Sequence, residues 1–425
     1  MTYQELLTYI YGLGRFGMKP GLARIKTLLK TLSNPQDCLK VIHVAGTNGK
    51  GSTAAFLSAI LTAGGHKVGF FSSPHLIQFT ERLRINGVAI TESQVVSVAE
   101  RVIAAAPGGT TFFELVTAMA YLYFAEQGVG AAIMEVGMGG RLDATNAASG
   151  ILSIITPIAF DHCEYLGESI AKVAWEKAGI IKPGRPVVVS IQPSEALAVI
   201  SDCSARLHSP LYCLNTDFSA AWQDSGLAYH GLNWKLSDLK PGIFGRYQAA
   251  NAACALFAAE MLAGQGFAEL DQRTARIGIE TAFWPGRMEM LAGPPRILLD
   301  GAHNPSGAAA LGEALSDIAY DRLILVAGIM ENKDIQGILD SLLPLADQVI
   351  AVTPGIARAF PSAELASLCR AEGSSVHDGG SVESGLEIAM RMAQESDLIL
   401  VCGSLYSVGE ARAILFSKKF EPFRG

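Results

Sequence analysis

At 425 residues, the chain exceeds the size at which a single hydrophobic core stops growing, so two domains are expected. Half of the residues are hydrophobic, 17% are charged and the net charge is −7, which excludes a disordered chain and argues against a broad nucleic-acid-binding surface. No apolar run reaches the roughly 18 residues of a membrane helix, and no secretory signal is visible. The seven scattered cysteines form no CxxC pair, so reduced thiols in a cytoplasmic protein are expected.

The first part of the chain alternates short apolar runs with helix-length segments. The runs lack period-2 alternation, as expected when helices cover both faces of a parallel sheet. They predict buried strands at 40–46, 67–73, 131–137, 151–158 and 185–191. Intervening helices are predicted at 52–64, 112–127 and 168–180. Residues 205–243 are less regular and predict strands with one exposed face. The alternation is typical of an α/β fold.

The composition changes near residue 292, where AGPPR (292–296) is typical of an interdomain linker. Beyond it the α/β pattern restarts. Apolar runs at 296–305, 322–329, 348–354 and 398–404 alternate with predicted helices near 306–318, 362–371 and 382–394. We therefore expect a parallel-sheet α/β domain over residues 1–291 and a smaller Rossmann-like α/β domain over residues 297–425.

The stretch VIHVAGTNGKGSTAAF, residues 41–56, predicts a phosphate-binding loop at the first strand–helix junction of this pattern. It departs from the Walker A pattern G-x-x-x-x-G-K-[ST], because Val44 and Gly51 stand where that pattern needs a glycine and a hydroxyl residue. The hydroxyls come one step later, at Ser52 and Thr53. The stretch is therefore either a nucleotide site of another kind or a tight turn that carries a solvated lysine.

Elementary chemistry favours the nucleotide site. Successive backbone N–H groups and the positive end of a helix dipole cradle phosphate oxygens at such a junction. Lys50 can reach the β- and γ-phosphates, and Ser52 or Thr53 can present a hydroxyl to Mg²⁺. The small residues at positions 46, 49 and 51 let the backbone approach the ligand.

Further blocks of sequence accompany this loop, in a fixed order along the chain. They are HVAGTNGKGST (43–53), FSSPHL (71–76), MEVGMGGRLDATN (134–146), DHCEYLG (161–167), WEKAGIIK (175–182), WPGRME (284–289), LDGAHNP (299–305) and GSLYSVGEAR (403–412). Together they resemble the folylpolyglutamate synthase/dihydrofolate synthase family, a branch of the Mur ligase superfamily. The resemblance runs from about residue 5 to about residue 415, and SSPHL and GGRLDATN point to the folate branch.

The resemblance implies ATP-dependent amide formation by an ATP-binding, P-loop-containing central domain followed by a glutamate ligase domain. A substrate carboxylate attacks the γ-phosphate of ATP to give an acyl phosphate, and the amine of L-glutamate then displaces the phosphate. The implied acceptors are dihydropteroate, the γ-carboxylate of (poly)glutamylated reduced folates, or both, so a bifunctional enzyme is expected. The expected partners are these small molecules alone, with no nucleic acid and no membrane, in a cytoplasmic monomer.

Such a site gathers several negative groups, so cations are required. Glu135 follows the apolar run AAIM at a strand end, where a lone carboxylate is costly to bury without a cation or metal; a salt-bridged acid is the alternative. The resemblance implies two Mg²⁺ ions held by Glu135, His162, Ser73 and Ser52. From the residues alone, His162 would be a core-edge histidine or an acid/base, and Ser73 a turn residue.

The resemblance also implies that Lys177, in WEKAGI, is carbamylated by CO₂, which turns a cation into an anion that can bind metal or position substrate. That requires a partly desolvated lysine with a lowered pKa. The sequence alone favours a solvated helix lysine paired with Glu176 or Glu168. Lys50 and His303 are the other catalytic residues that the resemblance suggests.

The nucleotide contacts that the resemblance implies lie on both sides of the linker, so ATP would be gripped between the domains and closure would exclude water. They are Gly46, Thr47, Asn48, Gly49, Lys50, Gly51, Ser52, Asn251, Arg287 and Asp300. Asn251 opens an alanine-rich helix, and without the resemblance it would be a helix-start polar residue.

Two segments match those that contact the pteridine part of the substrate in the family. They supply Thr111, Phe112, Phe113, Glu114, Arg141, Leu142, Asp143 and Ala144. The two phenylalanines can stack on a flat heterocycle, although aromatic residues at a helix start usually belong to the core. His303 and Ser404 follow strands of the second unit. They either face the incoming glutamate or the acyl phosphate, or stabilise their loops.

Two rival functions remain. A Mur-type ligase acting on a UDP-muramoyl substrate shares the phosphate loop and the lysine block, but SSPHL and a phosphate loop only about 45 residues into the chain argue against it. A P-loop NTPase switch or binding module would hydrolyse nucleotide without glutamate or folate. It leaves Lys177, Asp300 and the whole second domain without a role.

Overall fold

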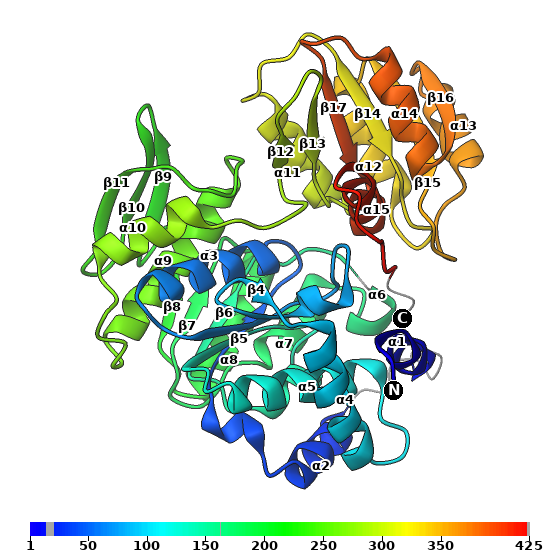
Figure 1. Cartoon of the computed structure of the whole chain (residues 1–425). Coiled ribbons are helices and arrows are strands. Elements are labelled where there is room, and N and C mark those ends of the chain that lie inside the picture. The colour runs from blue at the N-terminus through cyan, green and yellow to red at the C-terminus, as the bar shows by residue number, and fades with distance from the viewer. Residues whose placement is uncertain (14–20, 162, 423–425) are drawn as a thin grey trace.

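The computed structural model describes residues 1–13, 21–161 and 163–422 and shows two α/β domains joined near residue 290 (Figure 1). The first domain holds an eight-stranded sheet in the order β4-β3-β2-β5-β1-β6-β7-β8. Its strands are parallel except at the β3–β4 edge. The strand bounds are β1 (Lys40–Ala45), β2 (Val68–Phe71), β3 (Leu83–Ile85), β4 (Val88–Ala89), β5 (Ala131–Glu135), β6 (Leu152–Ile155), β7 (Val187–Val189) and β8 (Leu211–Cys213).

Helices cover both faces of this sheet, which explains why its strands read as continuous apolar runs. One face carries α3 (Lys50–Ala63), α9 (Gln248–Ala263) and α10 (Gln272–Thr281). The other carries α1 (Tyr3–Gly12), α2 (Ala23–Thr31), α4 (Glu92–Ala105), α5 (Phe112–Glu126), α7 (Ile170–Ala178) and α8 (Ser194–Arg206). The helices predicted at 52–64, 112–127 and 168–180 are confirmed as α3, α5 and α7.

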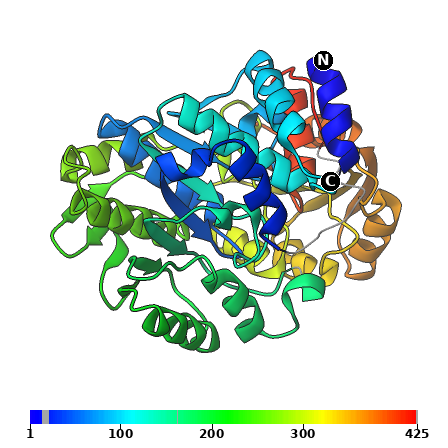
Figure 2. The same ribbon diagram turned by 90° about the horizontal axis from the view of Figure 1, so that it is seen from below.

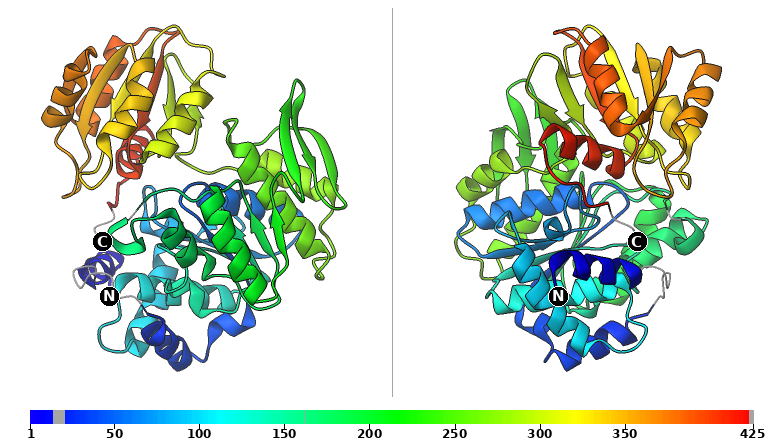
Figure 3. Two further views of the ribbon diagram at one scale, coloured as in Figure 1. Left: turned by 180° about the vertical axis from the view of Figure 1, so that it is seen from behind. Right: turned by 45° about the vertical axis from the view of Figure 1, so that its right-hand side comes forward.

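The irregular segment 205–243 contains a small antiparallel sheet, which confirms the expected strands. β9 (Ser219–Gln223), β10 (Gly226–His230) and β11 (Lys235–Leu239) pair in the order β11-β10-β9. The end of β9 is exposed, whereas the first four residues of β10 are buried against the core that α9 shares. This small sheet projects from the side of the first domain (Figure 3).

The second domain is a six-stranded sheet with helices on both faces, which agrees with the Rossmann-like expectation. The strand order is β12-β13-β17-β14-β15-β16, with only β12 antiparallel among the pairs described. Its strands are β12 (Glu289–Leu291), β13 (Arg296–Leu299), β14 (Leu323–Ala327), β15 (Gln348–Thr353), β16 (Val376–Ser381) and β17 (Leu398–Cys402). Its helices are α11 (Pro305–Leu315), α12 (Ile335–Leu342), α13 (Ser362–Ala371), α14 (Val382–Met392) and α15 (Leu405–Leu415).

The expected linker at 292–296 lies inside this second domain. β12 pairs with β13, Glu289 opposite Leu299, so AGPPR is the turn of a hairpin rather than a free connection. The chain therefore enters the second sheet ahead of residue 291, where the sequence suggested that the first domain ends. Proline and glycine mark a tight β-turn as readily as a linker, which is the physical reason for the difference.

The two domains are also joined where the chain leaves α15 and returns to the first domain, close to α1 (Figures 1 and 2). The backbone N–H of Glu421 donates to Ile77 O at 2.8 Å. In the opposite direction, the loop after β2 places Leu76 and Ile77 in a core cluster of the second domain, with Val408 of α15. The domains are therefore held together by the loop after β2 and by the segment after α15, in addition to the covalent connection near residue 290. No helix in the described part of the chain is long and apolar enough to cross a membrane.

Candidate active site

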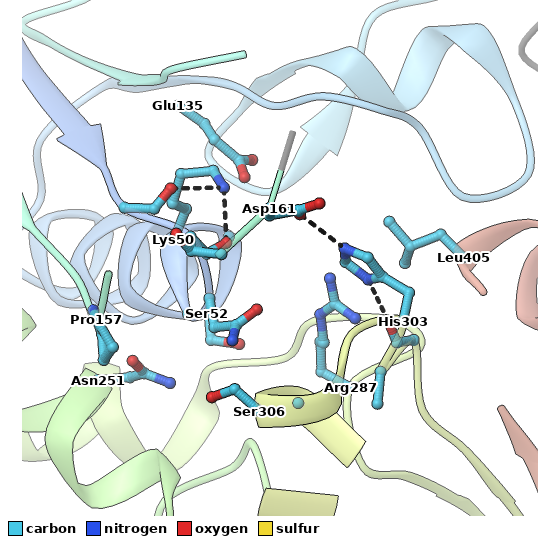
Figure 4. Close-up of a pocket in the computed structure, with 18 of the residues that line it drawn as sticks. Lys50, Ser52, Glu135, Pro157, Asp161, Asn251, Arg287, His303, Ser306 and Leu405 are labelled. Atoms are coloured by element: carbon cyan, nitrogen blue, oxygen red, sulfur yellow. Dashed lines mark hydrogen bonds and ion pairs between the residues drawn. The ribbon is translucent and has the colours of Figure 1, made fainter. Parts of the chain in front are cut away.

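Two adjoining cavities open where the domains face each other. The first, of about 290 Å³, contains the phosphate loop and the start of the second domain (Figure 4). The second, of about 770 Å³, lies between the α5 and β5 side of the first domain and the second domain. The two cavities share lining residues, so they are continuous; these are Ser73, Pro74, Gly137, Met138, Gly139, Leu166, His303 and Leu405.

The phosphate loop leaves β1 and enters α3, as the sequence predicts. Gly46 has φ +150°, and a Cβ there would overlap the Thr156 hydroxyl. Gly49 has φ +83°, and a Cβ there would overlap the Asn251 amide. The N–H of Thr47 donates to Pro157 O at 2.9 Å, which ties the loop to the chain after β6. Glycine is required at both positions, and the N-terminus of α3 faces the cavity.

Two buried lysines converge on one carbonyl of this loop. Lys50 Nζ donates to Gly46 O at 3.1 Å and to Thr47 O at 3.0 Å, and Lys177 Nζ donates to Gly46 O at 2.7 Å. Burial lowers the pKa of Lys50, opposed by Glu135 and Asp161. Burial, with the charge of Lys50 added, lowers the pKa of Lys177 to about 7. The solvated lysine considered for Lys177 is thus excluded: its side chain is buried at the end of α7.

Glu135 ends β5 within the first cavity and is buried. Burial raises the pKa of its carboxyl group, while Lys50, Arg287 and the backbone N–H of Ser73 oppose that rise. Ser52 and Ser73 line the same cavity. A carboxylate and two hydroxyls are oxygen donors of the kind that Mg²⁺ prefers, so these residues fit a magnesium site. His162 lies outside the described residues. Among the described residues, no three His, Cys, Asp or Glu side chains gather at one point, so substrate oxygens and water would complete the coordination.

The second domain contributes a buried acid and a cation. Asp300, after β13, accepts hydrogen bonds from the N–H groups of Met288 and Ala302 (both 2.9 Å) and from the Tyr247 hydroxyl (3.2 Å). Burial raises the pKa of Asp300, and Arg287 opposes that rise. Arg287 lines the first cavity, where a Cβ on Gly301 would overlap its guanidinium. The predicted nucleotide residues of the two domains are thus brought to one cavity.

Polar pairs connect the domains across this cavity, and sequence reasoning missed them. The amides of Asn48 and Asn304 exchange hydrogen bonds of 3.3 and 2.9 Å. Asp161 accepts from Lys333 Nζ at 2.6 Å, and its other oxygen lies 3.7 Å from His303 Nε2 (Figure 4). Asp161 and Asn304 are the sequence neighbours of His162 and His303, which the motifs did single out. That proximity is a signal by which the two residues could have been found. Nothing in the sequence around Lys333 indicates its role.

The second cavity is lined by all of the residues predicted to contact a pteridine, from Thr111 to Glu114 and from Arg141 to Ala144. His303 and Ser404 also line it. α5 forms where Thr111 accepts from the N–H of Glu114 and the Glu114 carboxylate accepts from Thr111 in return. Phe112 is buried and stacks on Tyr11, with ring centroids 5.8 Å apart, whereas Phe113 is only half-buried.

Several of these polar groups already have partners within the protein. Asp143 accepts from the N–H groups of Gly137 and Met138 at 3.1 and 3.0 Å, and from Thr145 at its other oxygen. The Arg141 guanidinium pairs with Glu176 at 2.8 Å and lies over the Trp175 ring. Ser404 caps α15 and is buried. These contacts support the loop-stabilising alternative for Ser404, and they show that the Asp143 carboxylate is also engaged by its own loop, although both residues lie at the cavity.

The sequence of each half matches a known domain family. Residues 44–259 match the Mur ligase middle domain, and residues 286–405 match the Mur ligase glutamate ligase domain. The chain is 34% identical to the dihydrofolate synthase/folylpolyglutamate synthase of Bacillus subtilis, over 97% of this chain and 98% of that one. It is 35% identical to the folylpolyglutamate synthase of Lacticaseibacillus casei, over 99% of this chain and 100% of that one.

Solved structures agree. Escherichia coli FolC in complex with DHPP and ADP superposes with a TM-score of 0.88, at 30% identity over 97% of this chain and 98% of that chain. The Mycobacterium tuberculosis folylpolyglutamate synthase complexed with ADP gives a TM-score of 0.90, at 32% identity over 98% and 99% of the two chains.

A phosphate loop that faces a Rossmann-like domain across a shared cavity defines an ATP-dependent ligase of the amide-forming class. Within that class, the chain belongs to the folylpolyglutamate synthase/dihydrofolate synthase family of the Mur ligase superfamily.

Proposed function

We propose that the protein adds L-glutamate both to dihydropteroate and to the γ-carboxylate of (poly)glutamylated reduced folates, by way of an acyl phosphate. The observation that carries the proposal is the continuity of the two cavities. One contains the phosphate loop, the other is lined by the predicted acceptor residues, and they meet at Ser73, Pro74 and His303. A carboxylate held in the second cavity can therefore reach a phosphate held in the first.

ATP binds in the first cavity, with its phosphates on the loop 46–52 and the start of α3. Lys50 now donates to two carbonyls of its own loop, and it can exchange these for phosphate oxygens. Asn251, Arg287 and Asp300 line the same cavity and bind the rest of the nucleotide. The acceptor carboxylate attacks the γ-phosphorus, the bond to the β-γ bridging oxygen breaks, and ADP leaves.

We assign two Mg²⁺ ions to this site, with Ser52, Ser73 and Glu135 as ligands that line the cavity and His162 as the ligand that the resemblance adds. When bound, the ions offset the charge of the phosphates and the carboxylate. Burial raises the pKa of Glu135, and Lys50, Arg287 and the N–H of Ser73 oppose that rise. A cation bound beside the carboxylate would favour its ionised form further.

Lys177 carries a carbamate formed with CO₂. Its burial and its lowered pKa, about 7, favour the neutral amine, which is the form that attacks CO₂. The N–C bond forms as one C=O bond of CO₂ opens, and the nitrogen releases one proton to solvent. The product is an anion beside Lys50, so the repulsion between two ammonium groups is replaced by attraction. A carbamate there would attract a bound cation, which a protonated lysine would repel.

The incoming glutamate binds where the second domain meets the second cavity. Lys333 and Arg358 line this part and supply positive charge for its two carboxylates, and Ser404 lies beside them. His303 Nδ1 donates to Gly301 O at 2.9 Å, which directs Nε2 toward Asp161 and the cavity. In the neutral ring Nε2 accepts the proton that the glutamate amine loses as it attacks the acyl carbon and phosphate leaves. The enzyme acts as a cytoplasmic monomer.

The test is an assay of purified protein with ATP, Mg²⁺ and L-glutamate, with either dihydropteroate or a reduced folate as acceptor. We expect ADP release that depends on glutamate and on each acceptor, with product masses that increase by one glutamate. A nucleotide switch would release ADP without either compound, and a UDP-muramoyl ligase would require its UDP-linked substrate. Absence of glutamate-dependent ADP release with both acceptors would overturn the proposal.

A further inference from the structure

The segment 416–422, which we call the C-terminal strap, leaves α15 and binds the first domain beside the second cavity. Its contact point is Glu421, which is 7% exposed. The Glu421 carboxylate accepts from the Tyr3 hydroxyl and from the N–H of Phe79, both at 3.0 Å. Its backbone N–H donates to Ile77 O at 2.8 Å. The side chain and the backbone of one residue are thus both bound by the first domain.

The carbonyl of Glu421 begins a chain of hydrogen bonds that leads to the cavity. It accepts from His75 Nε2 at 2.7 Å, and His75 Nδ1 accepts from Arg82 Nε at 2.9 Å. An arginine has only donors, so Nδ1 must be the unprotonated nitrogen and Nε2 must carry the hydrogen. The two hydrogen bonds together therefore fix the direction in which His75 donates and accepts.

Arg82 stands at the end of this chain, in the wall of the second cavity. Its side chain is almost fully buried, and its guanidinium carbon lies 5.3 Å from the centroid of Phe112, a predicted acceptor residue. The carboxylate of Glu135, in the first cavity, is among the groups that act electrostatically on it. Arg82 is therefore a cation close to the junction at which a carboxylate must meet the phosphate.

We propose that Arg82 binds the carboxylate-bearing end of the acceptor, and that the C-terminal strap positions Arg82 through His75. The inference rests on the proposed function, because it assigns a residue to the acceptor cavity. A guanidinium offers a planar pair of donors that matches a carboxylate, but only if its orientation is fixed. Because the strap belongs to the second domain, the position of that domain controls how well the first domain holds the acceptor.

A purely structural strap would predict a different pattern. Loss of its contacts would then lower stability and would affect the KM values of ATP and of the acceptor alike. The hydrogen-bond chain instead leads to the second cavity alone. Losing the strap should therefore raise the KM of the acceptor while the KM of ATP stays the same.

The chain offers matched variants for this test. A protein that ends at Phe420 lacks Glu421, whereas a protein that ends at Pro422 keeps it and is the control. His75→Asn retains an acceptor near Nδ1 for Arg82 but cannot reach the strap, and His75→Gln retains the donor to the strap but not the acceptor. Arg82→Gln removes the charge, and Arg82→Lys keeps the charge without the planar pair of donors.

We expect the protein that ends at Phe420 and His75→Asn each to raise the acceptor KM by on the order of tenfold, with the KM of ATP within about twofold of wild type. Their combination should raise the acceptor KM no further than either alone, because both remove the same hydrogen bond, between His75 Nε2 and Glu421 O. Arg82→Gln should raise the acceptor KM most, and Arg82→Lys should not restore it. The melting temperature of each variant shows whether it is folded.

Equal changes in both KM values, or an unchanged acceptor KM in the folded strap and His75 variants, would overturn the inference and leave the proposed function standing. Acceptor binding to the wild type, measured by calorimetry with dihydropteroate and without turnover, separates the two claims. If the wild type turns over normally and the acceptor KM of the variants equals that of the wild type, only the inference is refuted. Wild-type protein that neither binds nor uses an acceptor refutes both.

Discussion

At the scale of single residues, we expect the chemistry to depend on the two lysines that share the carbonyl of Gly46. Two ammonium groups on one acceptor repel each other, and burial removes the water that would screen them. Burial lowers the pKa of Lys50, but Glu135 and Asp161 oppose that fall. Burial and the charge of Lys50 lower the pKa of Lys177 to about 7. We therefore expect Lys50 to act as the cation of the pair and Lys177 as the amine that reacts.

Replacing Lys177 with Ala should lower turnover by at least about 100-fold, because a group that positions the reacting atoms is lost. In the wild type, activity should fall as the pH drops through about 7, since the protonated amine cannot bind CO₂, and added bicarbonate should partly restore it. A pH–rate profile and carbon-13 NMR of the carbamate test this. Lys172→Ala, on the exposed face of the same helix, is the control. Turnover of the Lys177 variant at the wild-type rate would remove its proposed role.

Gly46→Ala should weaken ATP binding at least tenfold and lower the free energy of unfolding by about 1–3 kcal/mol. The added Cβ meets the Thr156 hydroxyl and the backbone stands at φ +150°. Gly293→Ala is a matched control, because Gly293 has φ +152° and its nearest neighbour for a Cβ is Pro295 O at 3.7 Å. Nucleotide titration and thermal melting distinguish the two effects. Equal ATP affinity in the Gly46 and Gly293 variants would contradict the conclusion that the backbone at Gly46 must lie close to its neighbours for the loop to bind ATP.

At the scale of helices and strands, the features that a parallel sheet dictates were predictable from the sequence. The apolar runs identified β1, β5 and β17, and polar residues just after them share one edge because parallel strands end together. β16 was not predicted, since VHDGGS lies at the sheet edge with most of its side chains exposed. The pairs that join the domains were not predictable either, because no local pattern records which loops meet after docking.

Helix α15 holds the loop that carries Ser73, and Gly409 is the point of contact. A Cβ on Gly409 would overlap the backbone carbonyl of Leu76, which cannot swing aside as a side chain can. Gly409→Ala should therefore lower the melting temperature by several degrees and reduce turnover, because the loop and Ser73 must shift. Gly12→Ala, in α1 with no atom within 4 Å of its Cβ, should leave both unchanged. Wild-type turnover in the Gly409 variant would show that the loop does not depend on this packing.

At the scale of the whole molecule, the site exists only while the domains are together. Polar contacts rather than a broad apolar interface surround the first cavity, including Asn48 with Asn304 and Asp161 with Lys333. Such contacts exchange readily with water, which suits a closure that must admit and release substrates. The apolar part of the interface lies at the loop after β2, where Leu76 and Ile77 enter the second domain.

Asp161→Asn should favour the open arrangement, since it removes the charge that faces Lys333 and His303. We expect a larger radius of gyration in small-angle X-ray scattering and a higher fraction of ADP release that is not coupled to product. Asp317→Asn removes another interdomain ion pair, with Arg246, whose side chain is 71% exposed, and should change neither quantity because exposed pairs contribute little. Identical scattering and coupling in the wild type and Asp161→Asn would argue against this pair as a closing contact.

The C-terminal strap has a mechanical consequence. Besides the polar contacts at the cavity and the loop after β2, the second domain is held to the first at the entry to β12 and at Glu421. A rigid body fixed at two points keeps one rotational freedom, about the line that joins them, whereas a body on a single flexible connection can tumble. While Glu421 stays bound, we therefore expect the second domain to rotate about this line, so that each closure returns the same side chains to the substrate.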